Sequence, residues 1–350
     1  MKGTVVFLTS VWAPGYGVSV VVAEQCRILS KAGWNCVVGA VRVGAGMPAD
    51  IEVFRLPFVP VLLRSRLESL APSLVVACTA PFPAALAGWG IPWIQWEHGR
   101  ADQPEGPLHL EATAVERVGP SRWLASRFEP AGIAIPNGAD QLGRKAPSPR
   151  PGQPLRVVTA LRGGGAEARY KGNAFLLSLP RLVAREDISW ILMLRASEAE
   201  ADVFRRQGWQ VFRDPDRPTM AGIWHEADLH LAPSRIESFD LPLAEAQHLG
   251  CAGLALAGGA HEELCLQVFA EEADLVERLH RLDRREVDSL RAEAFAHVAP
   301  LTWLRHGEAL AELVRVHARP WDGPAPRAFL ARLVHAAAAC AYDLARRLLR

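Results

Sequence analysis

The chain of 350 residues is half apolar, which is enough for two domains of ordinary size, each with its own core. Lys and Arg total 39 against 38 Asp and Glu, and the net charge of +1 excludes the strongly basic composition typical of nucleic-acid-binding proteins. No apolar run is long enough for a membrane-spanning helix, and the N-terminal run is too short for a signal peptide, so we expect a cytoplasmic protein.

The cysteines support the same expectation. None of the six forms a C-x-x-C pair, and most lie in apolar runs, which predicts reduced core thiols rather than metal ligands. The histidines show no H-x-x-x-H or H-E-x-x-H spacing, and no D-x-D motif follows a predicted strand. We therefore predict no metal site and no cofactor.

The first part of the chain alternates short apolar runs with longer segments of helical periodicity. Its predicted strands are Thr4–Thr9, Cys36–Arg42, Glu52–Leu56, Leu74–Cys78, Trp93–Trp96 and Val115–Val118. Residues 143–154 are rich in Pro, Gly and basic side chains and lack apolar periodicity, which is typical of a linker. We assign residues 1–142 to a first domain that binds an acceptor.

The alternation restarts after the linker, in a second domain predicted over residues 155–319. Its predicted strands are Leu155–Leu161, Trp190–Leu194, Trp209–Phe212, Leu229–Ala232 and Gly253–Leu256. Buried runs that alternate with helices indicate parallel βαβ units. We therefore predict an α/β protein with two Rossmann-like domains that face each other across a cleft, with ligands beyond the carboxyl ends of the strands.

One stretch of the second domain, SRIESFDLPLAEA at residues 234–246, places two carboxylates around a tight turn. Glu237 follows a predicted strand, and Pro242 suits the first turn of a helix that carries Glu245 and ends near Gly250. The backbone N–H groups around Phe239–Leu243 would face an anion, and a carboxylate accepts two hydrogen bonds from sugar hydroxyls. A nucleotide diphosphate-sugar combines these groups. Alternatively, Glu245 interacts only with the helix dipole and Glu237 is a solvated loop charge.

This stretch resembles the E-x7-E signature of the family 4 retaining glycosyltransferases, which have the GT-B fold. The similarity extends over residues 223–263, and five further segments match the family in its order. These segments are APGYGVSVVVAEQCRILSKAGWNCVV (13–38), WEHGR (96–100), VGPSRWLASRF (118–128), IAIPNGAD (133–140) and LTWLRHGEALAELVRVH (301–317).

The resemblance implies roles for residues of the second domain. Arg162 and Lys171 match the Arg and Lys that neutralise the donor diphosphate, although GGGAEAR lengthens the loop between them and Arg169 is an alternative to either. Glu245 matches the ribose-hydroxyl acceptor, and Glu237 lies near the donor sugar. The remaining implied donor-binding residues are Ser238, Phe239, Asp240 and Leu241.

Asp240 departs from the glycine that is commonest in the family at this position. A carboxylate beside a diphosphate would repel the donor. Alternatively, Asp240 caps the helix that follows.

In the first domain the resemblance implies contacts to the donor from His98, Gly15 and Gly17. His98 would contact the transferred sugar; alternatively it is a structural histidine beside Glu97. The two glycines would let backbone approach the sugar and phosphate.

Together these features predict a retaining glycosyltransferase that moves a hexose-type sugar from a nucleotide-diphosphate sugar to a hydroxyl acceptor: a glycan, a glycolipid or a small molecule. Arg162 and Lys171 would stabilise the departing diphosphate, and domain closure would exclude water. Two alternatives remain: a GT-B epimerase or phosphorylase, and a catalytically silent subunit that binds a partner or a sugar nucleotide.

Residues 320–350 lie beyond the resemblance and predict an amphipathic helix with a strongly basic polar face. One interpretation is a helix that packs back on the first domain. The other is peripheral contact of residues 327–350 with the inner face of the membrane, which would suit a lipid-linked acceptor.

Overall fold

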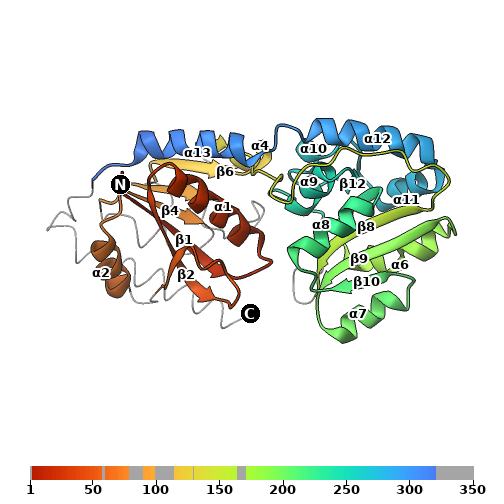
Figure 1. The fold of residues 1–350 in the computed structure, drawn as a ribbon, viewed down its shortest axis with the longest axis horizontal. Coiled ribbons are helices and arrows are strands. Elements are labelled where there is room, and N and C mark those ends of the chain that lie inside the picture. The colour runs from red at the N-terminus through yellow and green to blue at the C-terminus, as the bar shows by residue number, and fades with distance from the viewer. Residues whose placement is uncertain are drawn as a thin grey trace. The chain divides into compact units, whose positions relative to one another are not determined.

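The computed structural model describes residues 2–56, 60–78, 90–98, 114–128, 130–163 and 171–320 (Figure 1). By their contacts they form two compact units. The first contains the described residues up to Pro136 and helix α13 from His306 onward, and the second contains Asn137–Arg305. Each unit is an α/β domain built on one parallel sheet, as the alternating pattern predicts.

The first unit contains a seven-stranded sheet of order β3-β2-β1-β4-β5-β6-β7, in which every pairing is parallel. Its strands are β1 (Thr4–Trp12), β2 (Asn35–Val43), β3 (Glu52–Arg55), β4 (Leu74–Cys78), β5 (Trp93–Trp96), β6 (Glu116–Gly119) and β7 (Ile133–Ala134). The prediction missed only β7, because two residues are too few to show a period.

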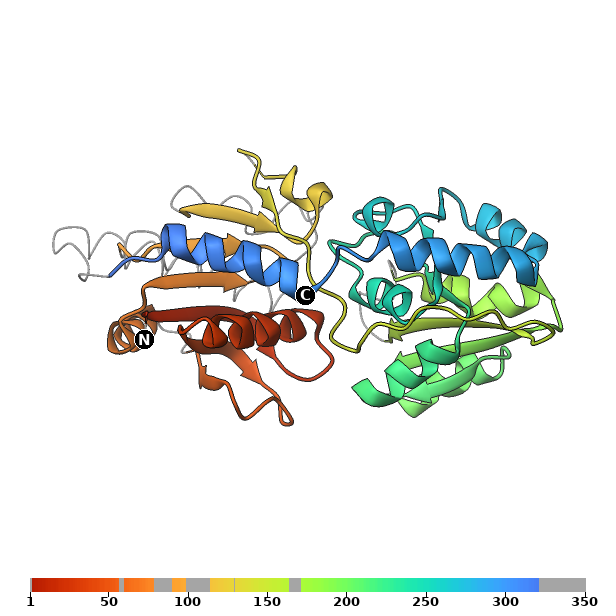
Figure 2. The ribbon, with the colours of Figure 1, turned by 45° about the horizontal axis from the view of Figure 1, so that its top comes forward.

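Helices cover both faces of this sheet. Its helices are α1 (Gly17–Lys31), α2 (Pro60–Leu70), α4 (Arg122–Ala125) and α13 (Trp303–His317). Alternate residues of β1 point to opposite faces. Val5 and Phe7 therefore share a core with α1 and α13, whereas Val6 and Leu8 share a core with α2. Figure 2 shows α1 and α13 over the same face of the sheet.

The second unit contains a six-stranded parallel sheet of order β10-β9-β8-β11-β12-β13. Its strands are β8 (Leu155–Arg162), β9 (Ile188–Arg195), β10 (Gln210–Arg213), β11 (Leu229–Ala232), β12 (Ala252–Leu256) and β13 (Val268–Phe269). In each sheet the strand order reverses its direction between two neighbouring strands. These strands are β1 and β4 in the first unit, and β8 and β11 in the second. This reversal is the usual ligand-binding point of a Rossmann sheet.

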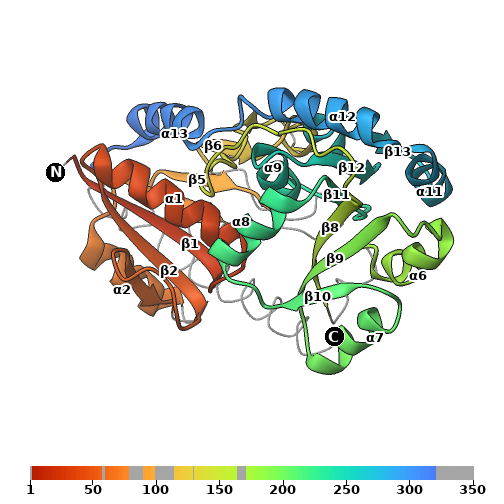
Figure 3. The same cartoon turned by 45° about the vertical axis from the view of Figure 1, so that its right-hand side comes forward.

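The helices of the second unit form two layers around its sheet. They are α6 (Asn173–Val183), α7 (Glu198–Arg205), α8 (Arg217–Glu226), α9 (Leu241–His248), α10 (His261–Leu264), α11 (Glu272–Arg281) and α12 (Arg284–His297). The larger core joins α6, α7, α11 and α12 to one face, and α8 and α9 pack on the other (Figure 3).

Helix α13 packs on the first unit, whereas the predicted domain boundaries place it in the second. The sequence assigned residues up to 319 to the second domain, but Leu310, Leu313 and Val314 are buried in the core of the first. His306 fixes the start of this return, because its Nδ1 lies 2.9 Å from the carbonyl oxygen of Pro136 and its Nε2 lies 3.1 Å from the amide nitrogen of Gln25. An apolar helical stripe shows that a helix packs, but not on which sheet.

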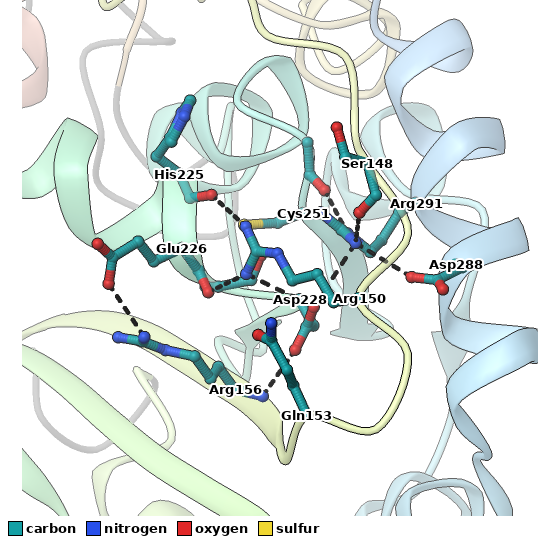
Figure 4. Close-up of polar contacts among 12 residues, drawn as sticks. Ser148, Arg150, Gln153, Arg156, His225, Glu226, Asp228, Cys251, Asp288 and Arg291 are labelled. Atoms are coloured by element: carbon teal, nitrogen blue, oxygen red, sulfur yellow. Dashed lines mark hydrogen bonds and ion pairs between the residues drawn. The ribbon is translucent and has the colours of Figure 1, made fainter.

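Residues 143–154, which the composition predicts as a linker, are bound to the second unit by three arginines. Arg291 donates to the carbonyl oxygen of Ser148 at 3.0 Å, and Arg284 donates to those of Gln153 and Pro154 at 3.0 and 2.9 Å. Arg150, within the segment, donates to the carbonyl of His225 at 2.5 Å, near the end of α8 (Figure 4).

These arginines surround Asp228, which is completely buried just before β11 (Figure 4). Its carboxylate accepts from Arg284 at 2.8 Å and from the backbone N–H of Arg156 at 2.9 Å, and Arg150 and Arg291 lie within 3.8 and 3.6 Å. A buried charge requires such partners. The segment is therefore an ordered part of the amino edge of the sheet.

The described cysteines, five of the six, are buried free thiols, as predicted. The predicted tail helix and its membrane contact at 327–350 lie outside the described residues, as does Arg169. Across the described ranges, no helix is long and apolar enough to span a membrane.

Candidate functional site

The carboxylate-rich turn lies at the carboxyl edge of the second sheet, at the switch point. Strand β8 ends at Arg162 and β11 ends at Ala232, and these neighbouring strands are followed by chain segments that leave in opposite directions. The turn 233–240 connects β11 to α9. This is the location predicted from the sequence, because Glu237 follows β11 and Glu245 lies in the second turn of α9.

Glu237 forms an ion pair with Lys171, the residue that precedes Gly172 and α6. Two glycines make this approach possible. A Cβ at Gly172 would lie 2.6 Å from the carbonyl oxygen of Pro233, and a Cβ at Gly259 would lie 2.0 Å from that of Glu237. Both glycines also have positive φ, 77° and 68°, which side chains disfavour. Lys171 and Glu237, both predicted from the sequence, therefore meet at the switch point.

Asp240 is the N-cap of α9, as one of the two sequence interpretations predicts. Its Oδ1 accepts from the backbone N–H of Leu243 at 3.1 Å, and its Oδ2 lies 3.1 Å from Nε2 of His261. Burial opposes ionisation of Asp240, but the hydrogen bond and charge of His261 outweigh it and lower the pKa to about 2. The carboxylate is therefore ionised, and the ring of His261 lies against it.

Glu245 is 1% exposed and is held by two side chains. Arg217, the first residue of α8, donates to both carboxylate oxygens at 2.6 and 3.1 Å. Gln141 donates to the same carboxylate and accepts from the indole N–H of Trp303 at 2.7 Å. Burial raises the pKa of Glu245, and Arg217 partly offsets this effect.

The backbone N–H groups at the start of α9 are less available to an anion than the sequence suggests. The N–H of Leu241 donates to the carbonyl of Phe239 at 3.1 Å, and the N–H of Leu243 is taken by the Asp240 cap. Pro242 has no N–H. The predicted anion site over Phe239–Leu243 therefore offers fewer available backbone N–H groups than expected, because a capped helix start satisfies its own donors.

Arg162 is the last residue of β8 and lies beside Arg195, the last residue of β9. It is half-buried at the same sheet edge as the turn. Residues 164–170, between Arg162 and Lys171, lie outside the described ranges.

The remaining predicted residues belong to the first unit. Gly15 has φ of 74° and precedes α1, and a Cβ at Gly17 would meet no atom within 4 Å among the described residues. His98 follows β5, and its ring stacks on Trp96 with centroids 6.4 Å apart. Burial and the nearby His306 lower the pKa of His98 to about 3, so its ring is neutral. Its buried Nε2 has no hydrogen-bond partner among the described residues.

No protein-family model matches the sequence, and no curated protein does at the threshold applied. Solved structures do match. HepE from Anabaena, in complex with UDP and glucose, is 17% identical with a TM-score of 0.71, and the match covers 90% of this chain and 100% of that one. A sucrose-phosphate synthase from Thermosynechococcus elongatus is 14% identical with a TM-score of 0.73, covering 90% and 99%.

A third structure, the lipopolysaccharide outer core galactosyltransferase WaaB in its apo form, is 13% identical with a TM-score of 0.66, covering 89% and 99%. These are GT-B glycosyltransferases. The chain has the GT-B fold. This fold class is the one predicted from the sequence, and the similarity extends over nearly the whole length of each solved chain.

Three residues of this GT-B site were not predicted: Arg217, Gln141 and His261. Each is a partner of a predicted carboxylate. A buried carboxylate requires a cation or several donors. This requirement indicates from the sequence that each carboxylate has a partner, but it does not identify which residue that partner is. Among the described residues, no group of three or more His, Cys, Asp or Glu is arranged to hold a metal ion.

Proposed function

We propose that the chain is a retaining glycosyltransferase of the family 4 type, which moves a hexose-type sugar from a nucleotide-diphosphate sugar to a hydroxyl acceptor. The observation that carries this proposal is the turn at the switch point, where Glu237 pairs with Lys171, Glu245 pairs with Arg217 and Asp240 pairs with His261. The site thus presents carboxylates without an excess of negative charge. Such a site can accept hydroxyls and still admit a diphosphate.

Each end of the donor would meet a different part of this site. Lys171 and Arg162, at the end of β8, would neutralise the diphosphate. Glu245 would accept the 2′- and 3′-hydroxyls of the ribose, which carries the diphosphate on its 5′ oxygen. HepE, which was solved with UDP and glucose, has the same fold and supports a donor of this class.

In the reaction, the bond between the anomeric carbon and the diphosphate oxygen breaks while the acceptor oxygen attacks from the same face. The acceptor proton passes to the leaving phosphate oxygen, so configuration is retained and no protein nucleophile is required. Lys171 stabilises the developing negative charge, a role typically worth about 10²–10³ in rate. His98, which is neutral, would serve as a hydrogen-bond partner of the transferred sugar and not as a cation.

A release assay tests this function. The protein is incubated with UDP-, GDP-, ADP- and dTDP-sugars, and free nucleoside diphosphate is followed without added acceptor. We expect slow hydrolysis of one donor, lost in Glu245→Ala and Lys171→Ala. Exposed residues of the same unit provide matched controls, Glu293→Ala and Lys145→Ala, which should retain the activity.

The contrary result is also informative. No release from any donor, together with no thermal stabilisation by any of the four nucleoside diphosphates, would exclude the transferase. It would favour a silent GT-B subunit.

A further inference from the structure

The pair of Asp240 and His261 lies within the donor-binding turn but has no assigned role. His261, the first residue of α10, is completely buried, and Asp240 is 9% exposed. The backbone N–H of Ala260 donates to the carbonyl of Glu237 at 2.8 Å. The segment that carries His261 is therefore fixed to the turn that carries Glu237 and Asp240.

Both ring nitrogens of His261 lie against acceptors. Nδ1 is 2.7 Å from the carbonyl oxygen of Leu256, and Nε2 is 3.1 Å from Oδ2 of Asp240. A carbonyl oxygen and a carboxylate oxygen both require a donor, so both nitrogens carry a proton and the ring is an imidazolium. The alternative, a neutral ring with a protonated Asp240, conflicts with the role of Asp240 as N-cap, because the helix start favours the carboxylate.

From this geometry we propose that His261 is a positioning residue for the donor: its imidazolium neutralises Asp240 and thereby keeps the turn open to a diphosphate. This inference rests on the proposed function. Without the imidazolium, Asp240 would be an uncompensated carboxylate beside the ion pair of Glu237 and Lys171, where the diphosphate would bind. Two carboxylates against one ammonium would repel an anionic ligand.

The charged and titratable groups around Asp240 and His261 determine which of them changes its charge at neutral and alkaline pH. Glu237 and Asp240 lie on the turn, Lys171 lies before α6, and His230 lies on β11. Burial lowers the pKa of His230 to about 4, so it stays neutral at neutral and alkaline pH. Burial also disfavours the charge on His261, but the hydrogen bond to Asp240 and its charge prevail and raise the pKa.

The sign of the pH effect follows. The imidazolium is present below the raised pKa of His261 and is lost as the pH rises through it. Donor affinity should therefore fall on the alkaline side, whereas binding of a ligand without phosphates should not. Above pH 7 the phosphates of a nucleoside diphosphate are already ionised, so their own titration does not contribute.

The experiment compares UDP, GDP, ADP and dTDP with their nucleosides by calorimetry between pH 7 and 9.5. His261→Gln removes the cation and leaves Asp240 charged. We expect its diphosphate affinity to fall about tenfold at pH 7, with nucleoside affinity unchanged. Asp240→Asn keeps the helix cap and removes the charge, so its diphosphate affinity should not show the alkaline decline.

Two further variants separate charge from packing. His261→Gln combined with Asp240→Asn should restore diphosphate affinity, because the uncompensated carboxylate is gone. His280→Gln, at an exposed histidine of the same unit, should match the parent protein. Thermal unfolding shows that each variant is folded, and the nitrogen-15 shifts of His261 should show two protonated nitrogens at pH 7.

The outcomes distinguish this inference from the proposed function. Equal losses of diphosphate and nucleoside affinity in His261→Gln, or no rescue by the double variant, would overturn the role of His261 and leave the transferase intact. A neutral His261 ring at pH 7 would also overturn it. If the parent protein binds none of the diphosphates or nucleosides, the proposed function fails, and the role of His261 fails with it.

Discussion

Carboxylates lie just before strand β11 and in the turn and helix that follow it, and their surroundings differ. At the amino end, Asp228 is completely buried and lies within 4 Å of three arginines, which also donate to backbone carbonyls. At the carboxyl end, Glu237 and Glu245 have one cation each, and those cations are 27% and 35% exposed.

The cations at the two ends differ in the groups that they bind. The arginines around Asp228 fix chain segments to one another, so their geometry is determined by the backbone on every side. Lys171 and Arg217 each pair with a carboxylate side chain and are partly exposed. The same chemistry is therefore structural at one edge of the sheet, and at the other edge we propose that it binds the donor.

The largest effect should come from Asp228→Ala, which leaves Arg284 and the buried Arg291 without their shared carboxylate. Removing one member of a buried ion cluster typically costs about 3–5 kcal/mol. We expect a loss of that size in the free energy of unfolding, measured with urea. Glu226→Ala, at an exposed carboxylate nearby, is the control and should be close to neutral. Similar stability of the two variants would remove the distinction between the edges.

Lys171→Ala should change the stability little and the turnover strongly, in contrast to Asp228→Ala. The ion pair with Glu237 is partly exposed, so its loss should change the unfolding free energy by about 1 kcal/mol or less. Turnover of the donor identified by the release assay should fall by about 10²–10³, because the leaving diphosphate loses a positioned cation. A stability loss as large as that of Asp228→Ala, without a specific fall in turnover, would make Lys171 structural.

Arg217→Met should make ribose recognition dependent on pH. Burial raises the pKa of Glu245, and without Arg217 the pKa rises further. The carboxylate exists above that pKa and is lost as the pH falls through it. We expect nucleoside affinity in this variant to fall as the pH is lowered, and to fall at higher pH than in the parent protein. Arg217→Lys, which keeps a cation, should reduce this dependence. An affinity independent of pH in Arg217→Met would mean that Glu245 does not bind the nucleoside.

Arg150→Ala should have the smallest effect of the four. It removes the donor to the last carbonyls of α8 but leaves Asp228 with Arg284 and Arg291. A hydrogen bond of this kind contributes about 1 kcal/mol net, so we expect a loss of that order in the urea titration and unchanged donor turnover. A loss equal to that of Asp228→Ala would show that Arg150 is the main counter-ion of Asp228.

Much of the fold could be predicted from the sequence, because burial on both faces of a parallel strand leaves a local signal. The runs at Leu74–Cys78, Trp93–Trp96 and Leu229–Ala232 coincide with β4, β5 and β11 to the residue. The start of α9 was predictable as well, because Asp240 and Pro242 are local signals for a helix N-terminus. The GT-B fold follows from this alternation together with the resemblance.

The sequence by itself thus determined the longer strands, the two α/β domains and the carboxylates of the turn, since each depends on neighbouring residues, but not the two-residue strands β7 and β13. Tertiary structure alone decided their partners. Lys171 is 66 residues from Glu237, Gln141 is 104 from Glu245, and His261 is 21 from Asp240. It also placed α13 on the first sheet and bound 143–154 to the second. These contacts depend on how the crossover connections bring strand ends together, and no local pattern of residues encodes that arrangement.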